Sequence, residues 1–388
     1  MNAATLPLHT CQGQPSWRLK SDRVTAFLTR LGGHLGPVTF ETEVGRVQPY
    51  AVAPWSRERL AAGTAPVLRV LRGDFFCAPF GGNDTAWRGE RHPAHGETAC
   101  QEWALRQLST AGGGGELVAE LRPRVRPGRV VKRLTLRPGE TNLYCQHELH
   151  GFKGPMSLGH HAMLRFPATE GAGRVTLSPW DHGRVCPLPF ERAAMGGYSA
   201  LRPGARFRTL NRVPLANGGY ANLSAYPARE GFEDLVMVSA RSSRPGRSLP
   251  AWTTVTFPKQ RYVWFALKDP RILASTILWH SNGGRHYPPW NGRHRRVLGL
   301  EEVTSYFHFG LAESAAPNPL ARTGVPTVLT LRPDRPLSVR YVMGVAAIPS
   351  GFDAVRQVLF RPGRLVLCAR SGRRVEHPVD LTFFPTTP

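Results

Sequence analysis

Short runs in which hydrophobic and polar residues alternate, or in which β-branched and aromatic residues gather, recur along the whole chain. Turn residues separate these runs at close intervals, and the pattern is typical of β-strands. The clearest predicted strands are residues 23–29, 130–136, 143–149, 235–239, 261–267 and 337–343.

Helical periodicity over a dozen residues is almost absent, and the best candidates for short helices are residues 270–278 and 352–359. Parallel α/β folds need a helix after nearly every strand, so this class is disfavoured. The glycine run 112–115 predicts a hairpin connection rather than a phosphate loop, because no Lys-Ser or Lys-Thr follows it. We therefore expect an all-β fold: a large antiparallel β-sandwich of two facing sheets, with few short helices and with long loops at one end forming a cleft.

The chain has 388 residues and 41% of them are hydrophobic, which is enough for a substantial core. Large all-β sandwiches often exceed about 200 residues as one unit, and no stretch marks a linker, so we expect one domain over residues 1–388. No window approaches the roughly 18 consecutive apolar residues of a membrane span. The first residues do not have the pattern of a secretory signal. These features predict a cytoplasmic protein without a membrane partner.

The formal net charge of +23 would ordinarily suggest a nucleic-acid partner. However, only five of the 50 basic residues are lysines, and the arginines are spread along the chain, as expected from a GC-rich bacterial genome. We expect no nucleic-acid partner and a monomer or homodimer, although a positive surface favours an anionic ligand. The six cysteines lie far apart without a CxxC pair, which argues against a zinc site and a disulfide framework.

Four segments concentrate titratable and aromatic residues beyond what strand packing requires. They are residues 77–84 with the following His95-Gly-Glu97 and Trp103, then 159–166, 279–290 and 297–305. Each alone has a simple structural explanation, such as a hydrogen-bonded strand histidine or a core tryptophan. Together they provide aromatic rings for a sugar face, polar groups for its hydroxyls, and an acid and a base for opening a hemiacetal ring.

In their order along the chain these segments resemble the aldose 1-epimerase, or galactose mutarotase-like, superfamily. Residues 17–34 resemble its opening hairpin, in which a glycine pair follows the second strand. The segment Cys77-Ala-Pro-Phe-Gly-Gly-Asn83 is similar to a stretch that ends in a substrate-facing Asn, and His95-Gly96 with Trp103 is similar to a His-Gly motif before a tryptophan strand. The resemblance covers about residues 15 to 350 and implies the galactose mutarotase-like sandwich.

Two further motifs resemble the catalytic segments of that superfamily. Gly159-His-His-Ala-Met-Leu164 is similar to its Gly-x-His strand, which implies His161 as general acid. Leu298-Gly-Leu-Glu301 is similar to the segment of the catalytic glutamate, which implies Glu301 as general base. Because neighbouring strand residues point to opposite faces, at most one of His160 and His161 can face a given pocket. The predicted sugar-binding residues are Asn83, His95, Trp279, His280, Arg88 and Trp290, and no metal ligand is included.

The chain also departs from the superfamily pattern. Asp84 follows Asn83 where an Arg is common, so Arg88 or Arg91 would have to substitute for it. The acidic residue that binds a sugar hydroxyl has no clear counterpart, and Asp181 is the candidate because it lies beside Trp180 and His182.

The resemblance implies an isomerase that interconverts sugar anomers. Glu301 would take the proton of the anomeric hydroxyl while His161, as imidazolium, protonates the ring oxygen. After the ring opens, rotation about the first carbon–carbon bond and ring closure give the other anomer. No redox, metal or nucleotide cofactor is needed, and the rate should rise as Glu301 ionises and fall as His161 loses its proton.

Two other functions remain open from the sequence. A metal-dependent sugar isomerase would draw its ligands from His95, Glu97, His160 or His161, His280 and Glu301. Alternatively, the same fold would bind carbohydrate without turnover, as a sensor or an accessory domain.

Overall fold

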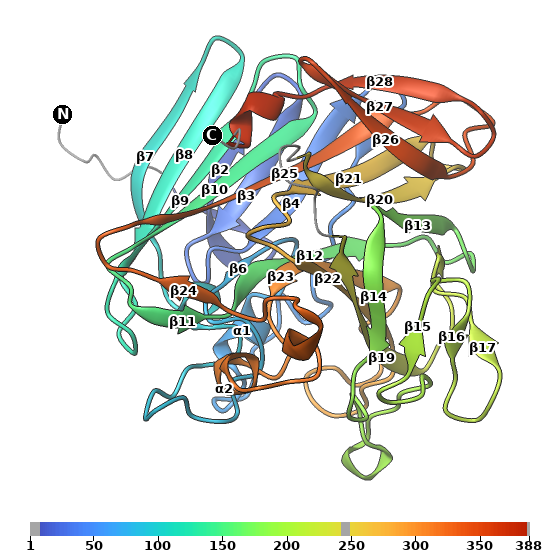
Figure 1. Ribbon diagram of the computed structural model, residues 1–388. Coiled ribbons are helices and arrows are strands. Elements are labelled where there is room, and N and C mark those ends of the chain that lie inside the picture. Colours follow the sequence, from blue (N-terminus) through green and yellow to red (C-terminus); the bar gives the residue numbers. More distant parts are fainter. Residues whose placement is uncertain (1–7, 242–248, 386–388) are drawn as a thin grey trace.

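Two large antiparallel sheets form the centre of the molecule (Figure 1). The computed structural model describes residues 8–241 and 249–385. The predicted absence of a signal at the start of the chain concerns residues that lie partly outside this range. The nine-stranded sheet has, in spatial order, β18 (Ala225–Tyr226), β13 (Gly173–Leu177), β20 (Ala251–Phe257), β21 (Tyr262–Lys268), β25 (Leu337–Ala347), β10 (Asn142–His150), β9 (Arg129–Leu136), β8 (Gly114–Leu121) and β7 (Ala104–Ala111).

The second large sheet has seven strands and carries most of the titratable segments noted in the sequence. Its spatial order is β15 (Arg206–Phe207), β14 (Trp180–Val185), β19 (Phe232–Ala240), β22 (Ser275–Asn282), β23 (Val297–Thr304), β12 (Leu158–Arg165) and β6 (Phe76–Cys77).

Smaller sheets and a few short helices complete the described structure. The N-terminal sheet contains β1 (His9–Cys11), β2 (Gln14–Lys20), β3 (Val24–Thr29), β4 (Leu35–Thr42) and β5 (Gly45–Val47), and the C-terminal sheet contains β26 (Val355–Arg361), β27 (Arg364–Ala369) and β28 (Arg374–Pro378). Two-stranded pairs are β11 (Gly154–Met156) with β24 (Leu329–Leu331), and β16 (Val213–Pro214) with β17 (Tyr220–Ala221). The helices are α1 (Pro66–Arg69), α2 (Leu311–Ala315) and the 3₁₀ turns η1 (Glu97–Ala99), η2 (Ala193–Met195), η3 (Ala321–Thr323) and η4 (Leu381–Phe383).

The strand alternation divides the core into two parts on either side of the seven-stranded sheet. Even-numbered side chains of β22 and β23, such as Leu278 and Leu300, pack with Trp264 of β21 between the two large sheets. Odd-numbered side chains, such as Ile277 and Val303, pack instead under the loops that cover the outer face of the sheet. β22 and β23 are therefore buried along their whole length on both faces.

The structure confirms the all-β class and the six strands predicted most clearly. It also confirms the hairpin, in which Gly112 and Gly113 adopt positive φ values of 56° and 81° between β7 and β8. Both predicted helices are wrong: β22 begins at Ser275, and β26 begins at Val355. In each case pairing with neighbouring strands overrides a weak local helical pattern. No helix among the described residues is long and apolar enough to cross a membrane.

Candidate active site

His161 and Glu301 lie opposite each other on neighbouring strands of the seven-stranded sheet. They are directly paired in the register of β12 and β23, and both point to the outer, loop-covered face. The His161 Nε2 atom lies 3.3 Å from the Glu301 Oε1 atom, and both side chains are buried. The structure thus brings together the predicted acid and base, and the pairing register holds them in place.

A second histidine, His308, contacts the other oxygen of the same carboxylate. His308 lies in the loop after β23, and its Nε2 atom is 2.5 Å from Glu301 Oε2. The loop is held because the Gly82 N–H donates to the His308 carbonyl. His308 was not predicted from the sequence, because it lies in an aromatic loop segment (Tyr306-Phe-His-Phe309) where no strand alternation indicates its direction.

Aromatic rings surround this histidine–carboxylate group. Phe75 stacks on His161, with ring centroids 4.5 Å apart. His95 meets His161 edge-on at 5.0 Å and lies 5.5 Å from His308, so this predicted residue does reach the site. Phe80 packs on the other side of His95 at 5.1 Å. His95 and His308 are partly exposed, while His161 and Glu301 lie buried beneath them.

Two further charged residues, Glu233 of β19 and Arg285 in the loop after β22, lie beside Trp279 and so extend the site. Glu233 of β19 is buried and accepts hydrogen bonds of 2.9 Å from the Trp279 indole N–H and the Ser281 hydroxyl. The Arg285 guanidinium lies 5.3 Å from the Trp279 ring centroid and donates to a glutamate, Glu191, at 2.6 Å. The Arg285 charge partly opposes the rise that burial causes in the pKa of Glu301. Neither Glu233 nor Arg285 was predicted.

Burial changes the proton affinity of the groups at the site. It raises the pKa of Glu301 to about 7, against the opposing charges of His161 and Arg285. It lowers the pKa of His161 to about 3, although the Glu301 charge opposes this change. Burial likewise lowers the pKa of His308 to about 3. Near neutral pH His308 is therefore a neutral donor to Glu301, and the His161–Glu301 pair shares at most one proton.

The tryptophans predicted to bind sugar are buried parts of the site. The Trp279 ring lies 5.6 Å from the His161 ring, edge to face. Trp290 packs edge-on against Trp279 at 6.0 Å and lies under Arg285, with 4.4 Å between the guanidinium and the ring centroid. The two rings therefore pack against His161 and Arg285 from the buried side of the site.

Asn83 lies in the loops around the site, where its polar atoms pair with backbone groups. Its amide donates to the carbonyls of Pro79, Gly81 and Pro93, and its side-chain oxygen accepts the Leu311 N–H at 3.0 Å. The side chain is buried, and its polar atoms are used by the backbone. In this arrangement Asn83 ties together the loops around the site.

The structure places several other predicted residues away from His161 and Glu301. His280 points to the opposite face of β22, where its ring packs 5.5 Å from Tyr226 between the sheets. Arg88 is exposed and stacks on Trp87, and Asp181 is exposed and pairs with Arg241 at 2.8 Å.

Of the metal ligands considered from the sequence, Glu97 and His160 also lie elsewhere. Glu97 accepts the backbone N–H groups of Arg124 and Val125, and His160 points between the large sheets. The described residues do contain a group suited to a metal at the site itself, because ligand atoms of His161, Glu301 and His308 all lie within 4.8 Å of one another.

Comparison with known proteins agrees with this architecture. A galactose mutarotase-like protein from Clostridium acetobutylicum aligns with a TM-score of 0.57 and 11% identity, over 88% of this chain and 98% of that one. A galactose mutarotase related enzyme from Lactobacillus acidophilus gives 0.53 and 11%, over 86% and 97%. The Slr1438 protein of Synechocystis gives 0.54 and 15%, over 89% and 99%.

The chain therefore has the galactose mutarotase-like fold, with a histidine–carboxylate site on the outer face of its seven-stranded sheet. No protein-family model and no curated protein sequence matches the chain.

Proposed function

We propose that this protein is a carbohydrate mutarotase of the aldose 1-epimerase type, with Glu301 as base and His161 as acid. The observation that supports this most directly is the buried His161–Glu301 pair, with 3.3 Å between Nε2 and Oε1. In a cyclic sugar the anomeric hydroxyl and the ring oxygen are bonded to the same carbon. An acid and a base that serve these two oxygens must therefore lie close together, as this pair does.

The reaction needs one proton on the pair. Glu301 removes the proton of the anomeric hydroxyl, and the His161 imidazolium protonates the ring oxygen as the bond between that oxygen and the anomeric carbon breaks. The open aldehyde then rotates, and both proton transfers run in reverse to close the other anomer. Burial makes Glu301 a stronger base and the His161 imidazolium a stronger acid than either group is in water.

NMR exchange spectroscopy on a panel of neutral, phosphorylated and acidic aldoses tests this proposal. Anionic sugars belong in the panel because the net charge of +23 favours them. Acceleration of anomer interconversion above the spontaneous rate would support the mutarotase proposal and identify the sugar class. Sugar binding without acceleration, by a folded protein, would instead favour a non-catalytic binding protein.

We expect kcat/KM to fall as the pH rises above about 7, because Glu301 has the higher of the two pKa values, at about 7. Below about pH 3 His161 is also protonated, and the base is lost. Between these limits the pair holds its one proton, mainly on Glu301, so the reacting form with the proton on His161 is the minor form. The sequence-based expectation assigned the two limbs in the opposite order, since it did not include the effect of burial on each group. Rates corrected for spontaneous mutarotation from pH 5 to 9 will test this; a flat profile would contradict it.

His308 is expected to position Glu301 rather than to touch the sugar ring oxygen. His308→Leu should lower kcat by about 10- to 100-fold, because the carboxylate loses the donor that orients it. Loss of that donor should also raise the pKa of Glu301 and move the alkaline limb to higher pH. His308→Gln, which retains a donor, should recover part of both effects. An unchanged pH profile in His308→Leu would argue against this role.

A second candidate function rests on the same three side chains. Two histidines and one carboxylate with ligand atoms within 4.8 Å can hold a divalent ion, as a metal-dependent sugar isomerase would require. Activity that disappears with a chelator and returns with added metal would favour this function over metal-free mutarotation.

A further inference from the structure

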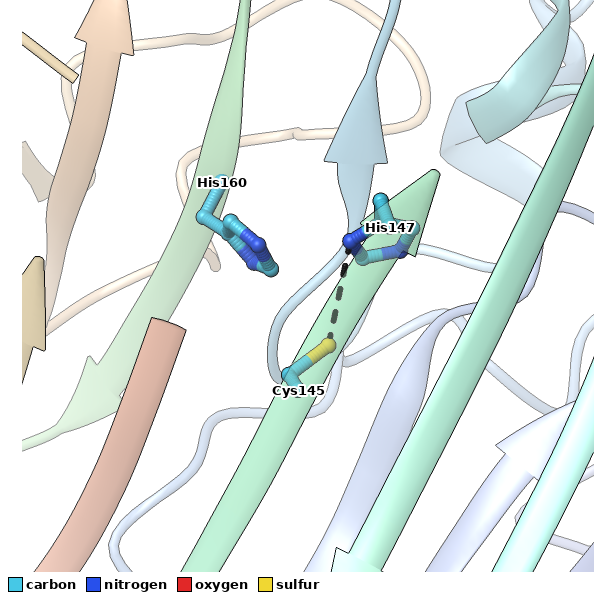
Figure 2. A group of neighbouring side chains, drawn as sticks. All are labelled: Cys145, His147 and His160. Carbon is cyan, nitrogen blue, oxygen red and sulfur yellow. Dashed lines mark hydrogen bonds between the residues drawn. The ribbon is translucent and has the colours of Figure 1, made fainter. Parts of the chain in front are cut away.

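A second group of potential ligands lies between the two large sheets, on the other side of β12 from the candidate active site. It consists of Cys145 and His147 of β10 and His160 of β12 (Figure 2). One ligand atom from each residue lies within 4.8 Å of the others, and all three residues are buried. The Cys145 sulfur is 3.8 Å from His147 Nδ1, and the His147 and His160 ring centroids are 5.0 Å apart.

Strand geometry explains why these three side chains meet. Cys145 and His147 are two residues apart on β10, so both point to the same face of the nine-stranded sheet. His160 is the neighbour of His161, so it points from the seven-stranded sheet toward β10. β12 therefore supplies one histidine to the outer site and one to the space between the sheets.

The histidines of this group have nitrogen atoms without partners. Among the described residues, neither His147 Nε2 nor His160 Nε2 has a hydrogen-bond partner, and both residues have 0% exposure. Buried polar atoms are normally paired, and an unpaired one costs free energy. His147 turns its Nδ1 atom, not the unpaired Nε2 atom, toward the Cys145 sulfur, and His160 Nε2 is the unpaired nitrogen that a ligand of this group would complete.

Asp74 orients the His160 ring so that its Nε2 atom can bind a ligand. Its Oδ2 atom lies 2.8 Å from His160 Nδ1, which keeps the proton on Nδ1 and leaves the Nε2 lone pair free. A carboxylate in this position is common behind metal-binding histidines, because it fixes the tautomer and the orientation of the ring.

Burial and the nearby charges act in opposite directions on the Cys145 thiol. Burial raises the pKa of the Cys145 thiol, and the nearby positive charge of Lys132 partly opposes this change. Lys132 is itself buried, which lowers its pKa, and it donates to the Gly33 carbonyl. Asp74 supplies a second negative charge. A dication would be balanced by one thiolate and this carboxylate, and the nearby Lys132 ammonium would leave the group with one net positive charge.

We propose that Cys145, His147 and His160 bind a zinc ion between the two large sheets, with Asp74 orienting His160. One thiolate and two imidazoles are a ligand set that zinc accepts, and a fourth position remains for water. On binding, the Cys145 thiol releases its proton to solvent and the sulfur forms the new bond to the metal. The ion would link β10 to β12 and so join the two sheets. This site is independent of the proposed mutarotase activity.

Metal loading of the full chain tests the site. Protein without a histidine tag is unfolded and refolded with Zn²⁺ or Co²⁺, because the group is buried, and the metal content is then measured after dialysis. Glu301→Gln is used as the background, so that the outer histidine–carboxylate group does not contribute. We expect one ion per chain, and a thiolate-to-cobalt charge-transfer band in the Co²⁺ form.

Cysteine variants show which cysteine supplies the sulfur ligand of the metal. Cys145→Ser should abolish the charge-transfer band, whereas Cys77→Ser and Cys368→Ser should retain it. Cys77 is the critical control, because its sulfur lies 3.5 Å from His95 Nδ1 near the outer site. If Cys145→Ser does not fold, X-ray absorption of the zinc form in the Cys77→Ser background should still show one sulfur ligand. Folded protein without bound metal, or a band lost only in Cys77→Ser, would overturn the proposal.

Discussion

Glu301→Gln is expected to lower kcat for anomer interconversion by about 10²- to 10⁴-fold. The amide keeps the shape of the side chain and can still contact His308, but it cannot accept the proton of the anomeric hydroxyl. Glu301 is fully buried between His161 and His308, so neither water nor a carboxylate from the buffer can reach this position and act as the base. The measurement is NMR exchange spectroscopy on the sugar that wild type turns over best, with sugar affinity measured in parallel.

The matched control for this variant is His280→Gln. His280 is a buried residue on the neighbouring strand β22, but its side chain points to the opposite face. We expect its kcat per folded molecule to remain close to that of wild type. A folded Glu301→Gln protein that retains the wild-type rate would eliminate Glu301 as the base.

Lys268→Met is expected to lower the free energy of unfolding by about 3–5 kcal/mol. Lys268 of β21 forms a buried ion pair with Glu302 of β23, and it also donates to the Ser275 carbonyl at 2.7 Å. The substitution leaves the Glu302 charge between the two sheets with only hydroxyl partners, at 2.5 Å from Thr253 and 2.6 Å from Thr276. Denaturant unfolding with linear extrapolation measures the change.

Two further variants test whether the loss of stability comes from the unpaired buried charge of Glu302. Lys268→Met combined with Glu302→Leu should recover much of the loss, because no unpaired charge remains. Arg46→Met, which removes an exposed ion pair with Glu41, should cost at most about 1 kcal/mol. A loss below about 1 kcal/mol in Lys268→Met would show that Glu302 is protonated or hydrated when its partner is absent.

The strand content and the fold class were predictable because the two-residue period of a strand is a local property. The same alternation predicted that His160 and His161 point to opposite faces. It could not show which face carries the candidate active site, because this depends on what covers each side of the sheet. The covering loops contain Phe75, Phe80 and His308, which come from distant parts of the chain.

The environments of His280 and Asn83 show the same limit. His280 lies next to Trp279 in sequence, yet only Trp279 shares the face of Glu301. Asn83 uses its polar atoms to hold backbone groups, a role that depends on partners at residues 79, 81, 93 and 311. Loop contacts of this kind have no periodic signal in the sequence.

By itself, then, the sequence determined the strands and the sandwich class, and its resemblance to the superfamily singled out His161 and Glu301, which the structure places side by side. Only the tertiary structure decided that His308, Glu233 and Arg285 complete the site, and that Cys145, His147 and His160 converge between the sheets. The physical reason is that alternation sets the direction of a side chain relative to its own strand. Its neighbours across a sheet or under a loop are set by long-range packing, which also determines burial and therefore the pKa values on which the proposed chemistry depends.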